Sequence, residues 1–292
     1  MRTPTAQNLS TIVTIGMFGL FLTACGLDKA PMLNTKGPVA EAQADLLFTA
    51  LYLMLIVVIP VFIFAALFVW RYRAGGKGKY MPDWAYSAKI DAVIWLVPAL
   101  IVAILGYLLW TTTHKLDPYK SIGNPDEAIV VQAVAQDWKW LFIYPDLGIA
   151  TVNELAFPSD KTLALRITSD TVMNSFMIPA LGGQIYAMAG MTSQLHLVAD
   201  EPGQFTGRNT MYSGDGFADQ HFQAYAMTNT DFDAWVEKVR QSSDTLDAQA
   251  YEVLVKPSIG HAIEYYSAYE DDLFQRILAK YAQRPGMSHS DN

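Results

Sequence analysis

Two long runs without a charged residue constrain this 292-residue chain more than any other feature. Residues 46–70 read LLFTALYLMLIVVIPVFIFAALFVW, and residues 92–113 read AVIWLVPALIVAILGYLLWTTT. About 20 apolar residues are enough for a helix to cross a hydrocarbon core of about 30 Å. Pro60 and Pro98 lie inside these runs, where a membrane helix tolerates proline if neighbouring helices satisfy the freed carbonyl. The sequence therefore predicts transmembrane helices over 46–70 and 91–113.

The loop over 71–90 between these runs is basic and sets their orientation. It contains one acid, Asp83, against five cations, Arg71, Arg73, Lys77, Lys79 and Lys89. By the positive-inside rule this loop is cytoplasmic, and the flanking parts of the chain are outside. From His114 onward the chain carries 12 Lys and Arg against 23 Asp and Glu. This acidic balance argues against a nucleic-acid partner.

The single cysteine, Cys25, follows a short apolar segment near the N-terminus. Residues 12–22 read IVTIGMFGLFL. The cysteine ends the motif LTAC, and small residues of this motif come directly before it. This pattern is typical of a bacterial lipoprotein signal peptide over 1–24, with Cys25 lipidated on the outer side of the inner membrane. The alternative is a free cysteine buried in a membrane helix. One cysteine excludes an internal disulfide and any site built on paired thiolates.

The segment over 125–228 has the pattern of a β-domain. Short β-rich runs alternate with turn residues, and the breakers are Pro158, Gly182, Gly183, Pro202 and Gly203. The runs are AIVVQAVA, WKWLFIYP, TVNELAF, LALRITS, QIYAMAG, TSQLHLVA and HFQAYAM. Such spacing predicts an antiparallel sandwich or small barrel.

The segment over 229–285 is predicted to be helical. Within 231–240, Phe232, Trp235, Val236 and Val239 recur at helical spacing, and Thr230 is a candidate cap. Residues 270–282 repeat the pattern with Leu273, Ile277, Leu278 and Tyr281. We expect these helices to pack on the barrel or on a partner.

The order of elements, together with DWKWLFIY, resembles subunit II of the haem–copper terminal oxidases. Its ubiquinol-oxidising, cytochrome bo-type branch is matched by five segments: YLMLIVVIPVFIF, AVIWLVPAL, DWKWLFIYPDLGIATVNELAFP, VMNSFMIP and GGQIYAMAGMTSQLHL. The resemblance implies a two-helix transmembrane hairpin, then an all-β cupredoxin-like barrel without copper ligands, and a C-terminal helical extension. It also implies a complex with a haem-bearing subunit I, which would hold haem and copper, and with other small membrane subunits.

In copper-bearing relatives a histidine and the loop C-x-x-x-C-x-x-x-H-x-x-M hold a two-copper electron-entry centre, because bridging thiolates share the charge between two ions. The corresponding loop here reads MYSGDGFADQHFQAYAM over 211–227. The resemblance places the ligand positions on Asn174, Tyr212, Gly216, Gln220 and Gln223. None is a copper-binding side chain, so no cofactor is expected on this chain. His221 is one residue beyond the histidine position, and we expect it to point to the opposite face of its strand. The other histidines, His114, His196, His261 and His289, have no paired spacing and are expected at the surface or at caps.

Three further residues are candidates for function. Asp91 lies at the cytoplasmic start of the second run and is a candidate proton-entry acid, because the family has a glutamate near this position. An equally favoured alternative is that this acid only complements the helix dipole. Trp138 and Trp140 match an aromatic patch that lies between electron donor and copper in relatives. Alternate residues of one strand share a face, so core packing or contact with the haem subunit is favoured for them here.

Two functions remain open at this stage. The first is subunit II of a proton-pumping ubiquinol oxidase, supporting assembly and proton uptake without a redox centre of its own. The alternative is a free-standing membrane lipoprotein whose cupredoxin-like domain binds a ligand or partner. A copper-bearing cytochrome c oxidase subunit is excluded by the residues at the ligand positions.

Overall fold

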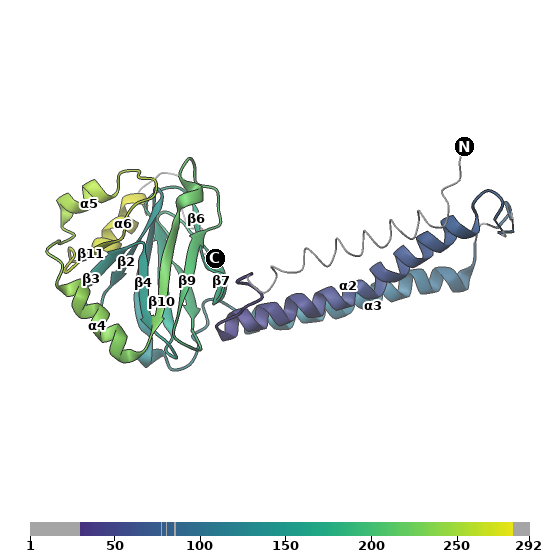
Figure 1. Ribbon diagram of the computed structural model, residues 1–292, viewed down its shortest axis with the longest axis horizontal. Coiled ribbons are helices and arrows are strands. Elements are labelled where there is room, and N and C mark those ends of the chain that lie inside the picture. Colours follow the sequence, from purple (N-terminus) through teal and green to yellow (C-terminus); the bar gives the residue numbers. More distant parts are fainter. Residues whose placement is uncertain (1–29, 77, 80, 85, 283–292) are drawn as a thin grey trace, which may run out of the picture. The chain divides into compact units, whose positions relative to one another are not determined.

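The computed structural model describes residues 30–76, 78–79, 81–84 and 86–282 (Figure 1). They belong to two units, a helical unit over 42–117 and a unit formed by 30–41 and 118–282, called the β-domain below. The signal peptide and Cys25 lie outside the described residues.

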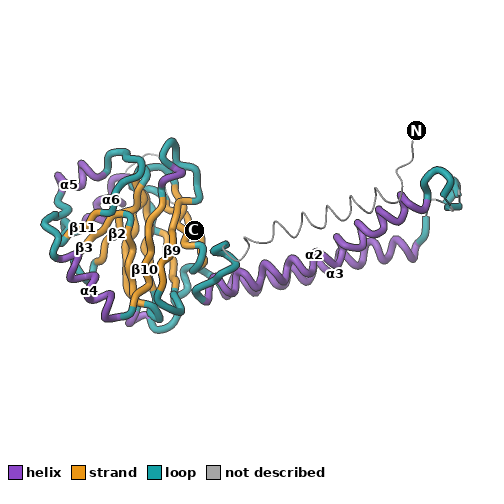
Figure 2. Tube along the Cα trace, viewed as in Figure 1, coloured by secondary structure: helices purple, strands orange, loops and turns teal. Residues whose placement is uncertain are grey.

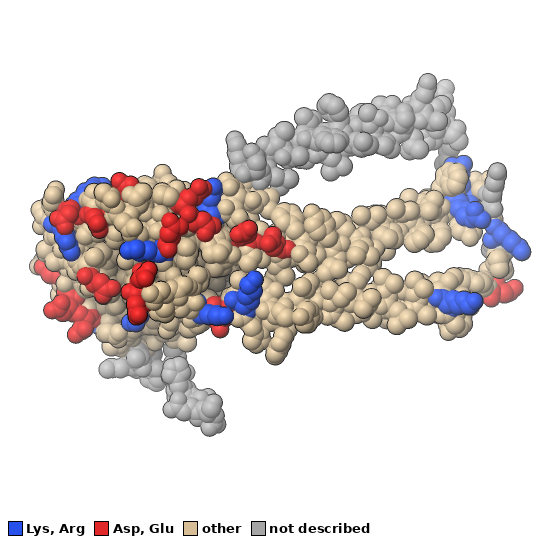
Figure 3. Space-filling model, turned by 90° about the horizontal axis from the view of Figure 1, so that it is seen from below, with Lys and Arg blue, Asp and Glu red and all other residues tan. Residues whose placement is uncertain are grey.

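The helical unit contains two long apolar helices, α2 (Pro38–Arg71) and α3 (Ala88–Lys115). Each is longer than the uncharged run that predicted it, because polar residues at the ends continue the helix. Both are long and apolar enough to cross a membrane, and in their most apolar windows 0% and 6% of the residues are buried. Figure 3 shows the basic residues of the connecting loop at one end of the pair, beyond uncharged helix surfaces.

The β-domain is a sandwich of two mixed sheets (Figure 2). The six-stranded sheet has the order β11-β3-β2-β1-β5-β8, and the five-stranded sheet has the order β4-β10-β9-β6-β7. The bounds are β1 Ile129–Gln136, β2 Lys139–Tyr144, β3 Ile149–Val152, β4 Glu154–Pro158, β5 Leu163–Ser169, β6 Asn174–Ile178, β7 Gly182–Ala187, β8 Ser193–Leu197, β9 Gly203–Asn209, β10 His221–Met227 and β11 Glu264–Tyr266. Trp140, Phe142, Phe157, Phe176 and Phe222 belong to the buried main core.

The predicted sandwich is confirmed, but not all of its strand pairs are antiparallel. Strand β1 pairs with β5 in parallel, and β4 pairs with β10 in parallel. Parallel neighbours need a crossover connection rather than a hairpin. The chain makes such crossovers when it passes from one sheet to the other.

The run TVNELAF is two strands rather than one. Strand β3 ends at Val152 in the six-stranded sheet, and β4 starts at Glu154 in the five-stranded sheet. Asn153 joins them with a φ of 57°, a left-handed conformation that asparagine adopts more easily than most residues. Both strands are buried throughout, so no alternation in the sequence marks the break.

Strands β6 and β9 were not among the predicted runs, although β6 lies within the family segment VMNSFMIP. Strand β9 reads GQFTGRN, where two glycines and polar outward residues mask the alternation. Four of the expected breakers lie at strand ends: Pro158 ends β4, Gly182 and Gly183 begin β7, and Gly203 begins β9.

The segment after residue 228 packs on the sandwich and is not only helical. Helix α4 (Asn229–Arg240) buries Phe232, Trp235, Val236 and Val239 as predicted. Its N-cap is Thr228 rather than Thr230, because the Thr228 side chain accepts a hydrogen bond from the Asp231 amide. Strand β11 then pairs with β3. Helices α5 (Ala248–Leu254) and α6 (Leu273–Ala282) contribute to a second buried cluster with Val134, Leu141 and Ile143 of the six-stranded sheet.

Tyr144 joins the two sheets through its hydroxyl group. This hydroxyl donates to the Ala156 carbonyl at 3.0 Å and accepts from the Ala156 amide at 2.9 Å. Ala156 lies on β4, the edge strand of the five-stranded sheet. Because β4 has no neighbouring strand on its outer side, the tyrosine hydroxyl serves as the hydrogen-bond partner of the Ala156 backbone there.

Tyr144→Phe is expected to reduce the free energy of unfolding by about 2 kcal/mol, because both backbone groups of Ala156 lose their buried partner. Burial raises the pKa of the Tyr144 hydroxyl above its ordinary value of 10.0. As the pH rises, this hydroxyl ionises in the unfolded chain before it ionises in the folded chain. Its contribution to the free energy of unfolding is therefore complete below about pH 10 and is lost as the pH rises further. Chemical denaturation of the full chain in mild detergent at pH 8 to 11 tests both points. A variant with unchanged stability and the same alkaline loss would contradict this role.

Candidate functional site

Three buried amide side chains meet at one end of the five-stranded sheet. Asn174 begins β6, Asn209 ends β9, and Gln220 directly precedes β10. The Asn209 Nδ2 group is 2.6 Å from Asn174 Oδ1 and 2.8 Å from Gln220 Oε1. Ser213 Oγ donates to the same Gln220 oxygen at 2.9 Å. We call Asn174, Asn209, Ser213 and Gln220 the amide cluster.

The backbone holds the amide cluster in place. Asn209 Oδ1 accepts from the amides of Ser175 and Met211, both at 2.9 Å. Asn174 Nδ2 donates to the Val172 carbonyl at 2.8 Å, and Gln220 Nε2 donates to the Gln136 carbonyl at 3.2 Å. The buried amide groups of the cluster therefore find their partners within the chain, as buried polar groups require.

Of the five predicted copper-ligand positions, the structure brings together two through hydrogen bonds, Asn174 and Gln220. Tyr212 is 74% exposed, and its ring lies 5.7 Å from that of Phe217. Gln223 accepts a hydrogen bond from Gln204 at the surface. Asn209 joins the two buried amides but was not predicted as a site residue, because the glycines of its strand mask the strand pattern. Its position just before the loop over 211–227 was the signal that could have indicated it.

Gly216, the remaining one of these five positions, lies directly against Trp138. A Cβ atom at Gly216 would be 2.4 Å from Trp138 Cδ2 and 2.5 Å from Cε3, far inside van der Waals contact. The indole Nε1 donates to the Ser213 carbonyl at 3.1 Å. The backbone at Gly216 has an ordinary φ of −93°, so only the indole excludes a larger side chain.

Trp138 and Trp140 do not form one patch on a strand. Trp138 lies in the two-residue turn between β1 and β2, whereas Trp140 lies on β2 and is fully buried. The Trp140 ring packs against Phe176 at 5.3 Å and Phe222 at 5.9 Å. The expected core packing applies to Trp140, and Trp138 instead covers the loop of the amide cluster.

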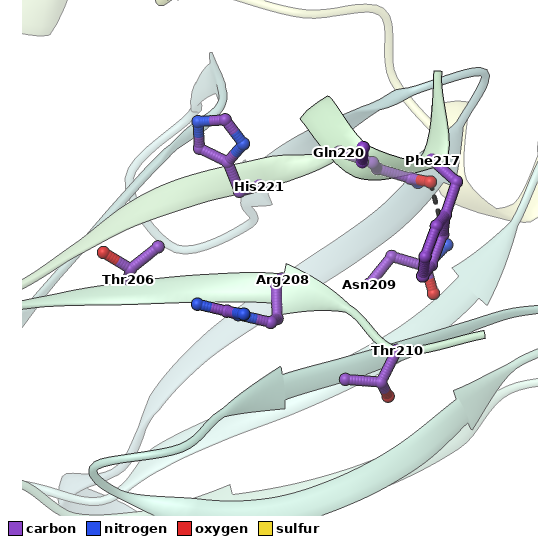
Figure 4. A pocket seen from close by; sticks show the side chains of 8 residues that line it. Thr206, Arg208, Asn209, Thr210, Phe217, Gln220 and His221 are labelled. Carbon is purple, nitrogen blue, oxygen red and sulfur yellow. Dashed lines mark hydrogen bonds between the residues drawn. The ribbon is translucent and has the colours of Figure 1, made fainter. Parts of the chain in front are cut away.

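Within the described residues, no group of three or more His, Cys, Asp or Glu side chains could hold a metal ion. His114 and His196 contact backbone carbonyls, of Trp110 at 2.8 Å and Pro118 at 3.0 Å. His261 contacts Ser258 at 2.9 Å and Glu264 at 3.1 Å. His221 is exposed, while the neighbouring Gln220 is buried, and their side chains point apart in Figure 4. His289 lies outside the described residues. The side chains at the five predicted copper-ligand positions offer neither sulfur nor imidazole, so they do not fit a dinuclear copper centre.

Asp91 lies in the first turn of α3 and is partly exposed. This place suits an acid that stabilises the positive end of the helix dipole, and it equally suits an acid that takes up protons at a membrane boundary.

A buried carboxylate, Asp170, ties the C-terminal helices to the strand connection that leads to Asn174. Tyr251 of α5 donates to Asp170 Oδ2 at 2.6 Å, and Lys280 of α6 donates to Oδ1 at 2.7 Å. The Tyr281 hydroxyl donates to the Asp170 carbonyl at 2.8 Å. Burial raises the pKa of Tyr251, so this hydroxyl stays a donor over the physiological range. Asp170 therefore anchors both C-terminal helices to the connection between β5 and β6.

Comparison with known proteins gives one consistent family. Residues 148–221 match the family model "Cytochrome C oxidase subunit II, periplasmic domain", and residues 240–284 match "COX Aromatic Rich Motif". The chain is 49% identical to cytochrome bo(3) ubiquinol oxidase subunit 2 of Pseudomonas putida, over 90% of this chain and 83% of that protein. It is 48% identical to ubiquinol oxidase subunit 2 of Acetobacter aceti, over 90% of this chain and 85% of that protein. Among solved structures, the periplasmic domain of cytochrome oxidase subunit II of Bradyrhizobium japonicum aligns with a TM-score of 0.37 and 24% identity, over 38% of this chain and 91% of that one.

Proposed function

Because this chain belongs to the family of subunit 2 of the cytochrome bo(3)-type ubiquinol oxidases, we propose that it is the second subunit of a proton-pumping ubiquinol oxidase. The near full-length similarity to two ubiquinol oxidase subunits and the two helices able to cross a membrane support this role. In such a complex the haem and copper groups that react with oxygen would be held by the partner subunit I.

The amide cluster supports the further proposal that electrons do not pass through this chain. Dinuclear copper requires thiolate and imidazole ligands, and Asn174 and Gln220 are amides already satisfied by Asn209. Gly216 lies beneath Trp138, so this position has no room even for the Cβ atom of a cysteine. The β-domain is then a support for the complex, and ubiquinol would deliver its electrons to the partner subunit from within the bilayer.

We propose that the chain is anchored in the bacterial inner membrane, with the loop after α2 in the cytoplasm and the β-domain in the periplasm. The charge difference between this loop and the rest of the chain supports the orientation. The segment before Cys25 supports lipidation at that residue.

Purification of the full chain in mild detergent from its native membrane tests the proposed function. We expect it to copurify with haem and a large polytopic subunit, in a complex that oxidises ubiquinol and consumes oxygen. We also expect the electron paramagnetic resonance spectrum to lack a mixed-valence dinuclear copper signal. Recovery of a haem-free protein would instead support a free-standing lipoprotein, and a mixed-valence signal from this chain would contradict the loss of the copper site.

We propose that Asp91 helps to collect protons at the cytoplasmic side. If so, Asp91→Asn is expected to slow proton-coupled turnover by about tenfold, the lower end of the range for electrostatic steering of charged species. Oxygen consumption and proton release by the reconstituted complex are the measurements. Asp83→Asn, in the basic loop directly before α3, is the matched control, since it removes an equal charge and is expected to have little effect. Equal rates for the wild type and Asp91→Asn would leave Asp91 as a residue that stabilises the start of α3.

A further inference from the structure

A surface hollow of about 630 Å³ opens beside the amide cluster (Figure 4). It is lined by side chains of β9, of β10 and of the loop between them. Asn209 and Gln220 belong to the amide cluster; the other lining residues are Thr206, Arg208, Thr210, Phe217, Ala218 and His221. We call this the Arg208 hollow.

The hydrogen-bond donors that line the Arg208 hollow lie on two paired strands. Arg208 and His221 are direct partners in the antiparallel pairing of β9 with β10. Thr206 lies two residues before Arg208, so both side chains project from the same face of β9. All three residues are exposed, and Figure 4 shows their side chains around the same hollow. A guanidinium group carries five N–H donors in a fixed planar arrangement, which matches anionic oxygens.

Arg208 brings a positive charge to this hollow, and the exposed Asp219 lies between the lining residues Ala218 and Gln220 along the chain. Among the described residues, Arg208 has no ion pair and no side-chain hydrogen bond, and no Asp or Glu lines the hollow. A second hollow of about 320 Å³ shares Thr206 and Arg208 and adds Lys36, whose amine pairs with Glu201.

We propose that the Arg208 hollow is a binding site for a phosphate group. Arg208, Thr206 and His221 offer guanidinium, hydroxyl and imidazole donors side by side on one face of the sheet, and a phosphate group has several oxygens to accept from them. The hollow is larger than a phosphate group, so the rest of a phosphate-bearing molecule has room beside it. Both free phosphate and a phospholipid headgroup have this chemistry.

Titration of the full chain in a maltoside detergent, which carries no phosphate, with inorganic phosphate, followed by calorimetry, tests the proposal. We expect saturable binding that Arg208→Gln weakens by at least about tenfold, since a hydrogen bond to a charged group contributes about 1.5 to 3 kcal/mol. Thr206→Val removes one hydroxyl at nearly constant shape and is expected to weaken binding by about tenfold, because this hydroxyl also donates to a charged group.

Arg166→Gln is the matched control, because Arg166 is also an exposed strand arginine but lies on β5 of the other sheet. It is expected to bind phosphate as the wild type does. Equal weakening by Arg166→Gln and Arg208→Gln would show a general charge effect and overturn the proposal, as would the absence of saturable binding in the wild type. Unfolding curves of the variants provide the check on folding.

The same titration in nanodiscs of phosphatidylglycerol distinguishes the two sources. If a lipid headgroup occupies the hollow, the discs will weaken the apparent affinity of the wild type for free phosphate relative to detergent, and Arg208→Gln will bind equally poorly in detergent and in discs. If free phosphate is the ligand, the wild type will have the same affinity in both.

Discussion

Gly216→Ala is expected to reduce the free energy of unfolding of the β-domain by about 3 kcal/mol, the upper end of the usual cost of overpacking. The added Cβ atom would be 2.4 Å from Trp138 Cδ2, so the indole must move and lose its hydrogen bond to the Ser213 carbonyl. Because Gly216 has an ordinary backbone conformation, the cost comes from space and not from the φ angle. Chemical denaturation of the full chain in mild detergent, followed by tryptophan fluorescence, is the measurement.

Gly106→Ala is the control for this substitution. Gly106 lies inside α3, and a Cβ atom there meets nothing within 4 Å. The β-domain should therefore unfold as in the wild type. Combination of Gly216→Ala with Trp138→Ala should cost less than the sum of the two single changes, because the clash disappears with the indole. Strict additivity would show that Trp138 does not restrict position 216.

Asp170→Ala is expected to cost about 3 kcal/mol and to free the C-terminal helices from the sandwich. The substitution removes two hydrogen bonds to a buried carboxylate, from Tyr251 and Lys280, each contributing about 1.5 kcal/mol or more. Tyr251 belongs to α5 and Lys280 to α6, so both helices lose an anchor at once. Limited proteolysis should then cleave within 248–282 faster than in the wild type.

Two other variants separate this anchor from general charge effects. Asp170→Asn keeps the shape and one acceptor, so we expect an intermediate loss of stability. Glu237→Gln breaks the exposed pair with Arg240 and should cost less than about 1 kcal/mol. If Asp170→Ala left proteolysis of α5 and α6 unchanged, hydrophobic contacts alone would hold these helices.

The large elements could be predicted because their signals are local. The uncharged runs around Pro60 and Pro98 specify membrane-length helices by length and composition. The apolar spacing of Phe232, Trp235 and Val236 specifies the buried face of α4. The break at Asn153 could not be predicted, because β3 and β4 are buried on both faces and no period changes between them.

The candidate site was predictable only in part. The family motif predicted the copper-ligand positions, and the residues at these positions carry neither sulfur nor imidazole. It did not indicate that Tyr212 and Gln223 lie at the surface or that Asn209 joins Asn174 to Gln220. Nor did it indicate that the charge of Arg208 is unpaired.

The sequence by itself determined the membrane-length helices, the β-rich domain and the chemical character of each ligand position. Hydrophobic period and residue type are properties of neighbours along the chain, so they can be read without coordinates. Only the tertiary structure decided which distant side chains meet: Asn174 with Asn209, Gly216 with Trp138, and Asp170 with Lys280. Such contacts depend on the pairing of strands far apart in sequence, and a shift of one residue would turn each side chain to the other face.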